Sequence, residues 1–139
     1  MNSSPTGAPR PSVSEYVLDA SALLALMFGE PGAEEIVQLV SVAEISAVNL
    51  AEVAAKMQER GVPDSEIDRG IADLRLSVVP FDAEQAVSSG KLRARTRSLG
   101  LSLGDRACLA LALARGLPAV TMDRGWARLD IGLEVIVAR

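Results

Sequence analysis

Tyr16-Val17-Leu18-Asp19-Ala20-Ser21 is the stretch that decides the fold of this 139-residue chain. A short apolar run ends in an acid, and a helix-like apolar run over residues 22–28 follows directly. An uninterrupted apolar run is typical of a strand that is covered on both faces of a parallel sheet. Asp19 is then expected at the carboxyl end of that strand, which is the edge where open α/β sheets bind ligands.

The same alternation of short apolar runs and helical segments continues to the end of the chain. We expect strands over 15–18, 44–48, 77–80, 118–121 and 133–137, and helices over 22–28, 33–40, 50–60, a segment beginning at 63, 82–98 and 103–115. The expected helix N-caps are Ser21, Asn49, Asp82 and Ser102. Strands that alternate with helices predict an α/β fold with a central parallel sheet of about four or five strands.

Composition predicts one domain after a short leader. Residues 1–14 are rich in Ser and Pro and are expected to form a flexible leader, and residues 15–139 can bury a core of their own. Hydrophobic residues make up 49 % and aromatic residues only 3 %, which suits aliphatic helices packed on a small sheet. The chain has neither a bilayer-length apolar run nor a signal-peptide pattern, so we expect a cytoplasmic protein.

Two absences restrict the chemistry. The chain has no histidine, and Cys108 is its one cysteine. These counts exclude an intrachain disulfide, a Cys/His zinc site, a Ser-His-Asp triad, a Cys-His pair and a histidine general base. A hydrolase of this composition is left with carboxylates and a hard metal such as Mg²⁺ or Mn²⁺, because the available ligands are oxygens.

Four acids lie where predicted elements meet: Asp19, Glu52, Asp105 and Asp123. Each has an ordinary structural explanation. Asp19 and Asp123 could cap turns or helices, Glu52 could form a capping box with Asn49, and Asp105 could favour the dipole of its helix. Together the four acids are predicted on one edge of one sheet, where like charges would repel one another and raise their pKa values. A bound divalent cation would remove that cost and polarise a phosphate.

The sequence also predicts roles for four residues that lie near these acids in the sequence. Ser21 offers a hydroxyl that could hold a water beside a metal, and it is equally explained as an N-cap. Gly104 directly before Asp105 allows another group to approach closely. Trp126 is expected to pack over the turn after residue 123, and Cys108 is expected to be a small buried hydrophobe.

Charge is unevenly spread around a net value of −4. Residues 1–90 hold 14 acids and 5 bases, whereas residues 91–139 hold 4 acids and 9 bases. The acidic total argues against tight nonspecific nucleic-acid binding, and the basic C-terminal third allows a local phosphate-binding face. The segment 91–97 carries four bases on a predicted helix; a solvated surface explains them, and contact with substrate phosphates is the alternative.

Four motifs, taken in order, resemble those of PIN-domain ribonucleases and especially of VapC-type toxins. They are Val17-Leu18-Asp19-Ala20-Ser21-Ala22-Leu23-Leu24-Ala25-Leu26, Asn49-Leu50-Ala51-Glu52-Val53, Leu103-Gly104-Asp105-Arg106-Ala107-Cys108-Leu109-Ala110-Leu111-Ala112 and Thr121-Met122-Asp123-Arg124-Gly125-Trp126. No single motif is specific, but all four in this order are. The resemblance covers about residue 16 to the C-terminus. It implies a PIN-like, Rossmann-like α/β/α sandwich and an Mg²⁺- or Mn²⁺-dependent endoribonuclease.

The resemblance also implies roles for individual residues. The acidic catalytic set would be Asp19, Glu52, Asp105 and Asp123, with Asp19, Asp105 and Asp123 as metal ligands. Ser21, Asn49 and Thr121 would support this set. Arg106 or Arg124 would stabilise the phosphate during in-line attack of water on an RNA phosphodiester, although either could be plain surface. VapC-type proteins typically form homodimers and are neutralised by a cognate antitoxin, which lays a peptide across the active-site groove.

Other protein classes that place an acid at a strand end fit less well. A receiver domain needs a lysine after a later strand, and neither Lys56 nor Lys91 follows one. A haloacid-dehalogenase-type phosphatase needs a second acid two residues after the first, where this chain has Ser21. The remaining alternative is a non-catalytic PIN-like module that binds RNA or an antitoxin. Loss of Mn²⁺ binding on neutralising Asp19 or Asp105 would argue against that alternative.

Overall fold

A central parallel sheet organises the part of the chain that the computed structural model describes, residues 13–138. The leader predicted over residues 1–14 lies outside the described residues except for its last two. The strands are β1 (Tyr16–Leu18), β2 (Ala43–Ser46), β3 (Ser77–Val79), β4 (Ala119–Thr121) and β5 (Val135–Val137). Every neighbouring pair is parallel, which confirms the prediction of a parallel sheet of about four or five strands.

The order of the strands creates a switch point at the centre of the sheet. The order is β3-β2-β1-β4-β5, so the chain winds outward from β1 to β3 and then returns to build β4 and β5 on the other side. Leu18 of β1 is in register with Ile45 of β2 and with Val120 of β4, so the carboxyl ends of these three strands lie within one residue of the same level. In open α/β sheets, ligands bind outside the carboxyl ends of strands at such a switch point, here between β1 and β4.

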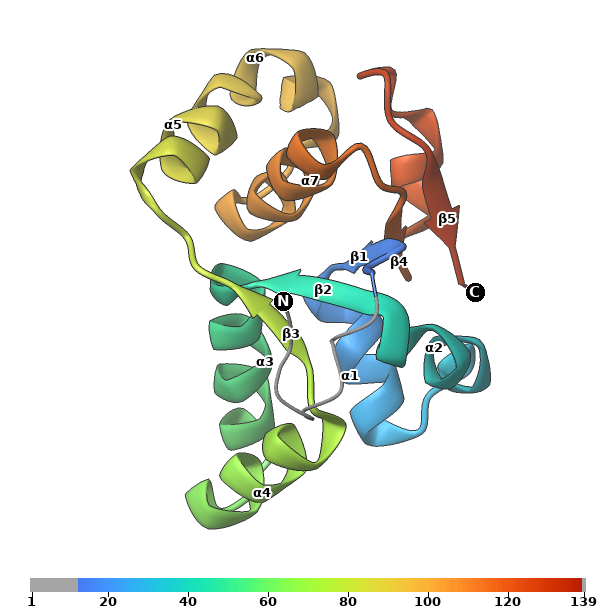
Figure 1. The fold of residues 1–139 in the computed structure, drawn as a ribbon, viewed down its shortest axis with the longest axis vertical. Helices are drawn as coiled ribbons and strands as arrows, with labels where there is room; N and C mark the ends of the chain where they lie inside the picture. Colours follow the sequence, from blue (N-terminus) through green and yellow to red (C-terminus); the bar gives the residue numbers. More distant parts are fainter. Residues whose placement is uncertain (1–12, 139) are drawn as a thin grey trace, which may run out of the picture.

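Helices cover both faces of this sheet (Figure 1). One face carries α1 (Ala20–Phe28), α2 (Ala33–Leu39), α3 (Ala47–Glu59) and α4 (Asp64–Leu74); the other carries α5 (Ala83–Lys91), α6 (Arg93–Thr96) and α7 (Leu103–Arg115). Short 3₁₀ segments are η1 (Val40–Val42), η2 (Arg97–Leu99) and η3 (Arg124–Arg128). The α/β/α sandwich is therefore confirmed. Within residues 13–138, no helix is both long and apolar enough to cross a membrane.

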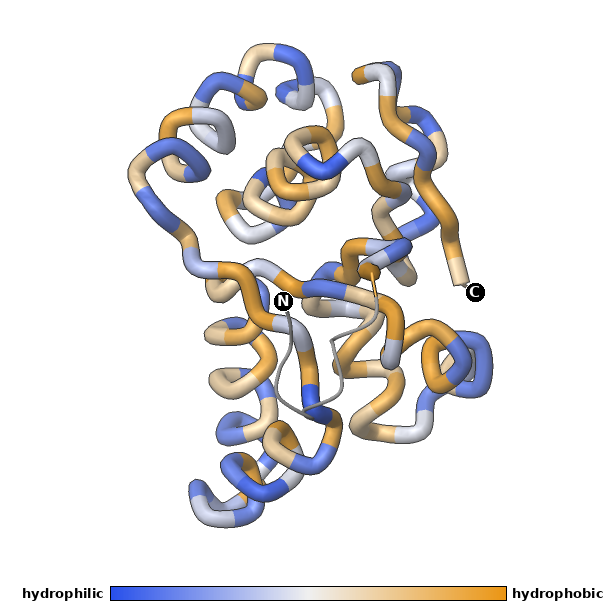
Figure 2. Tube along the Cα trace, viewed as in Figure 1, coloured by the Kyte–Doolittle hydropathy of each residue, from blue (hydrophilic) through white to orange (hydrophobic). Residues whose placement is uncertain are grey.

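The core is built on both faces because successive strand residues point to opposite sides. Val17 and Ala119 pack in the cluster formed with α7, whereas Leu18 and Val120 pack in the cluster formed with α1 and α2. Trp126 is buried in the α7 cluster, in line with its expected packing. Figure 2 shows hydrophobic residues along the strands and on α1 and α7, and mostly hydrophilic stretches on the outer helices α4 and α6.

Two predicted helix starts were wrong, and both corrections affect the site. Asp19, not Ser21, is the N-cap of α1, because its side chain accepts from the backbone N–H of Ala22. The predicted strand 44–48 already ends at Ser46, whose hydroxyl caps α3 by accepting from the backbone N–H of Val48. Asn49 therefore lies inside α3 and is not its N-cap.

The long helix predicted over 82–98 is divided into α5, α6 and η2. Asp82 caps α5 as expected, since its carboxylate accepts from the backbone N–H of Gln85. The division occurs at Leu92, whose side chain is buried and whose carbonyl accepts a hydrogen bond from Thr96 Oγ1 at 2.9 Å. A hydroxyl that bonds back to a carbonyl four residues earlier commonly bends a helix.

Candidate active site

Asp19 occupies the centre of the sheet edge and is only 3 % exposed. Its Oδ1 accepts from the Ser21 hydroxyl at 2.7 Å and from the Ala22 backbone N–H at 2.8 Å. Its Oδ2 accepts from the Thr121 hydroxyl at 2.5 Å. The N-cap role of Asp19 uses one oxygen only, so helix capping does not account for the two hydroxyls that hold the carboxylate in place.

The hydroxyls of Ser21 and Thr121 connect the ends of β1 and β4. Ser21 Oγ accepts from the Met122 backbone N–H at 3.0 Å, and Thr121 Oγ1 accepts from the Asp123 backbone N–H at 3.1 Å. The two hydroxyl oxygens lie 3.3 Å apart. Both predicted supporting residues therefore contact Asp19 directly, Ser21 from two positions away in the sequence and Thr121 from 102 positions away.

Glu52 is held against the start of α7 by Asn49. The side-chain amide of Asn49 donates to Glu52 Oε1 and to the carbonyl oxygen of Gly104, each at 3.0 Å. A Cβ atom at Gly104 would overlap the Glu52 carboxylate, so the expected close approach at this glycine is confirmed. The capping-box interpretation of Asn49 and Glu52 is wrong, because Ser46 caps the helix.

Asp105 has a structural role that the sequence also allowed. It forms a capping box with Ser102, in which each residue's backbone N–H donates to the other's side chain at 3.1 Å. Within this capping box, Oδ2 of Asp105 accepts the hydrogen bond from the Ser102 backbone N–H. The charge of Asp105 contributes to raising the pKa of Asp19, so the two carboxylates are electrostatically coupled.

Burial dominates the electrostatics at this edge of the sheet. It raises the pKa of Asp19 to about 6, against the lowering effect of the hydrogen bonds from Thr121, Ala22 and Ser21. Burial also raises the pKa of the Cys108 thiol, as expected for a buried small hydrophobe. The charges of Asp19, Asp105 and Glu52 raise the pKa of this thiol further, so all three carboxylates act on the same buried point of α7.

The remaining predicted residues make other contacts. Asp123 is exposed and caps η3 by accepting from the Gly125 backbone N–H at 2.8 Å, which is its ordinary explanation. Arg124 is exposed. Arg106 is buried, which excludes the plain-surface explanation, and its Nη1 donates to the Ser89 carbonyl at 3.0 Å. That bond ties α7 to α5 and accounts for Arg106 without any contact to a substrate.

The donor set suits a hard divalent cation, although it is not a preformed cage. Within residues 13–138, no group of three or more His, Cys, Asp or Glu side chains is arranged to hold a metal ion, and the metal-ligand set of Asp19, Asp105 and Asp123 stays a prediction. The candidate ligands are nevertheless all oxygens, and buried Asn49 Oδ1 has no hydrogen-bond partner. Mg²⁺ commonly keeps several waters and uses one or two carboxylates, which this arrangement can supply.

A cavity of about 370 Å³ opens beside Ser21. Its lining includes Lys56 and Arg60, two basic residues that were not selected from the sequence. The signal that could have found them is their four-residue spacing on the helix that carries Glu52, which places them on one helix face.

Comparisons with known proteins agree with this fold. The family model for the PIN domain matches residues 16–132. A toxin–antitoxin complex from Klebsiella pneumoniae has a chain that is 20 % identical, with 90 % of this chain and 98 % of that chain covered and a TM-score of 0.70. VapC20 of Mycobacterium tuberculosis, a sarcin–ricin-loop cleaving toxin, is 17 % identical over 86 % of this chain and 99 % of its own, with a TM-score of 0.69.

A third solved structure, VapBC2 from Rickettsia felis bound to a promoter DNA fragment, contains a chain that is 19 % identical. The match covers 86 % of this chain and 96 % of that chain, with a TM-score of 0.66. No curated protein matches the sequence. Because the PIN model spans most of the chain, this protein belongs to the PIN domain family.

Proposed function

We propose that this chain is a metal-dependent endoribonuclease that hydrolyses RNA phosphodiester bonds. The observation that carries the proposal is the environment of Asp19. Its carboxylate is buried at the switch point of the sheet, its pKa is raised, and its partners are neutral hydroxyls and a backbone N–H. A desolvated carboxylate that is oriented in this way is suited to binding a cation from solution.

Each acid has a role in this proposal. Asp19 and Asp105 hold Mg²⁺ or Mn²⁺, Asp123 is a further ligand, and Glu52 orients the attacking water. When bound, the metal polarises the phosphate and helps water to lose a proton. Ser21 and Thr121 fix the orientation of Asp19, and Asn49 fixes that of Glu52. Arg124, exposed next to Asp123, is the better placed of the two arginines to contact the phosphate.

We further propose that the protein is the toxin of a type II toxin–antitoxin pair. Support comes from its family and from the likeness of its fold to chains of toxin–antitoxin complexes. A cognate antitoxin would then cover the Asp19 edge, and the toxin would act as a homodimer in the cytoplasm, where its RNA substrate is found.

A cleavage assay on total cellular RNA tests the nuclease activity. The purified chain is incubated with the RNA in Mg²⁺ or Mn²⁺, with an EDTA control and with Asp19→Asn as the matched variant. We expect discrete fragments that appear only with the metal and only with Asp19. Metal-independent fragments, or equal cleavage by a well-folded Asp19→Asn protein, would contradict the proposal.

A second candidate function is a non-catalytic module that binds RNA or an antitoxin. It is favoured by one observation: no three acids converge as a metal cage within residues 13–138. RNA or antitoxin binding by a well-folded chain that neither cleaves RNA nor binds Mn²⁺ would support this alternative.

A further inference from the structure

The cavity beside Ser21 is continuous with the proposed active site. Ser21 lines it and donates a hydrogen bond to Asp19 Oδ1, and Met122, which also lines it, donates its backbone N–H to Ser21. An occupant of the cavity would therefore lie one side chain away from Asp19. Its volume of about 370 Å³ falls in the lower part of the range for small-ligand pockets, roughly 300–1,000 Å³.

The cavity has an apolar wall and a basic wall. The apolar wall comes from Leu24 and Phe28 of α1 together with Met122. The basic wall comes from Lys56 of α3 and from Arg60, the C-cap of that helix. Glu30 also lines the cavity and leaves a net lining charge of +1. This positive sign differs from the chain as a whole, which carries a net charge of −4.

The two basic side chains are held loosely enough to reach an incoming ligand. Arg60 lies 4.3 Å above the centre of the Phe28 ring and pairs with Glu30 at 3.5 Å. Lys56 pairs with Glu59 at 3.6 Å. All four charged side chains of these two ion pairs are well exposed, and exposed pairs of this kind contribute little, about 0–1 kcal/mol. A phosphate can therefore replace Glu30 and Glu59 at small cost.

We propose that this cavity binds one nucleotide of the RNA, adjacent to the cleaved bond, with the base on the apolar wall and a phosphate on Lys56 and Arg60. This inference rests on the proposed nuclease function and adds a substrate-positioning site to it. The apolar wall offers the aromatic ring of Phe28 with a guanidinium stacked on it, and bases stack on both kinds of surface.

The charges favour a nucleotide over a segment of a partner protein. Two cations at i and i+4 on one helix face, next to a carboxylate that acts on phosphodiesters, match a polyanion whose phosphates repeat along the strand. A protein segment could use the apolar wall, but it would need acidic side chains to satisfy the basic one.

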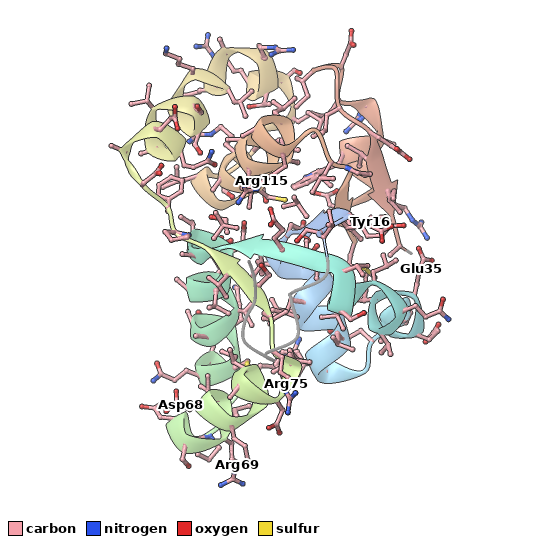
Figure 3. All side chains as sticks on the ribbon, in the orientation of Figure 1. Tyr16, Glu35, Asp68, Arg69, Arg75 and Arg115 are labelled. Atoms are coloured by element: carbon pink, nitrogen blue, oxygen red, sulfur yellow. The ribbon has the colours of Figure 1, made fainter. Side chains whose placement is uncertain are left out.

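Equilibrium binding of a fluorescent pool of random-sequence, single-stranded octaribonucleotides tests this assignment. All proteins carry Asp19→Asn so that the probe stays intact. The double variant Lys56→Gln/Arg60→Gln should bind about tenfold more weakly, and the slope of log affinity against log salt should fall by about 0.7, since the contact with one phosphate is lost. The charge-matched control is Arg69→Gln/Arg75→Gln, with Arg69 on α4 and Arg75 at the C-cap of that helix, which should bind like the parent (Figure 3).

Two further variants keep the test independent of folding. Lys56→Gln alone leaves Arg60 and its contact with Phe28 in place and should lower the salt slope by less than about 0.7. Arg60→Lys keeps the charge and should retain most of the affinity. Thermal unfolding of each variant confirms that the fold is intact.

The outcomes separate this inference from the nuclease proposal. Parent-like affinity and salt slope in the Lys56→Gln/Arg60→Gln protein, or no binding of the pool by the parent, would overturn the nucleotide site and leave the cavity to a protein segment. Metal-dependent cleavage that is equal with and without the double substitution would retain the nuclease and reject the site. Lost binding in the double variant of a chain that cleaves no RNA would retain the site and reject the nuclease.

Discussion

Two buried carboxylates, Glu44 on β2 and Asp19 directly after β1, are treated differently by the fold. Glu44 on β2 is 8 % exposed and pairs with Arg115 of α7, whose Nε lies 2.7 Å from Glu44 Oε1. Arg115 lies between α7 and the sheet in Figure 3. Asp19 follows β1, is 3 % exposed, and is held by the hydroxyls of Ser21 and Thr121 and by a backbone N–H.

The difference indicates which acid is structural and which is functional. Arg115 supplies the counter-charge of Glu44, so the free-energy cost of burying this carboxylate is offset within the fold. Asp19 is oriented by neutral donors, and its burial raises its pKa to about 6. A fold that orients a carboxylate in this way, yet places an arginine beside the neighbouring one, keeps Asp19 available for a cation from solution. The predictions below test this contrast.

The largest expected effect is on cleavage. Asp19→Asn should lower the rate of metal-dependent RNA cleavage by at least about 1,000-fold, roughly 4 kcal/mol of transition-state stabilisation, because it removes a principal proposed metal ligand. Glu44→Gln, the matched neutralisation on β2, should stay within about threefold of the parent. Rates are compared in single-turnover assays with each protein in excess. Similar losses in the two variants would remove the distinction between the carboxylates.

The next effect is on stability against pH, measured without metal. The pKa of Asp19 is about 6 in the folded chain and near 3.8 when unfolded, so the folded chain binds this proton more tightly than the unfolded chain. The resulting contribution to the free energy of unfolding is complete below pH 3.8 and is lost as the pH rises through 6. Asp19→Asn does not titrate there. Its free energy of unfolding should therefore exceed that of the parent by a margin that grows from pH 4 to pH 7, up to about 3 kcal/mol.

Urea unfolding in EDTA at intervals between pH 4 and pH 8 measures this margin. A margin that is constant across the range would show that Asp19 is not a desolvated acid in the folded chain. A margin that shrinks as the pH rises would mean that folding lowers the pKa of Asp19 and does not raise it.

A smaller effect is expected from crowding Glu52. Gly104→Ala places a methyl group where the Glu52 carboxylate lies, so it should displace that carboxylate and lower cleavage about 30-fold. The control is Gly90→Ala in α5, where a Cβ atom meets open space. It should leave cleavage unchanged and stabilise the helix by about 0.5–1 kcal/mol. Parent-like cleavage by the Gly104→Ala protein would mean that Glu52 is not needed where it lies.

The smallest expected effect is on the structural pair. Arg115→Gln removes the cation beside Glu44 and should lower the free energy of unfolding at pH 7 by about 1 kcal/mol, a modest cost because Arg115 is half-exposed and water can reach the carboxylate. This change is opposite in sign to that expected for Asp19→Asn. Chemical denaturation at pH 7 compares the two, and a stabilised Arg115→Gln protein would contradict the structural role of the pair.

The sequence was sufficient for the sheet and for its edge. Short apolar runs ending in polar residues place Asp19 and Thr121 at strand ends, and parallel strands bring those ends together. The helix starts were harder to predict because Ser, Asn and Asp are all good N-caps. β-branched Val48 made the second strand look longer than it is, and this displaced the expected cap from Ser46 to Asn49.

Contacts between distant residues could not be read from one sequence. Glu44 and Arg115 are separated by 71 positions, and nothing local marks either as buried. The hydrogen bond from the Asn49 side chain to the Gly104 carbonyl depends on how α3 packs against α7. Sequence spacing could place Lys56 and Arg60 on one face of a helix, but the cavity that gives them a partner exists only in the folded chain.

The most direct test of the central claim is Mn²⁺ binding, measured by electron paramagnetic resonance on EDTA-stripped protein. We predict that the parent binds Mn²⁺, that Asp19→Asn weakens this binding at least about tenfold, and that Glu44→Gln leaves it unchanged. Equal Mn²⁺ binding by the parent and the Asp19→Asn protein, or no binding by the well-folded parent, would contradict the account of Asp19 as a carboxylate kept for a metal.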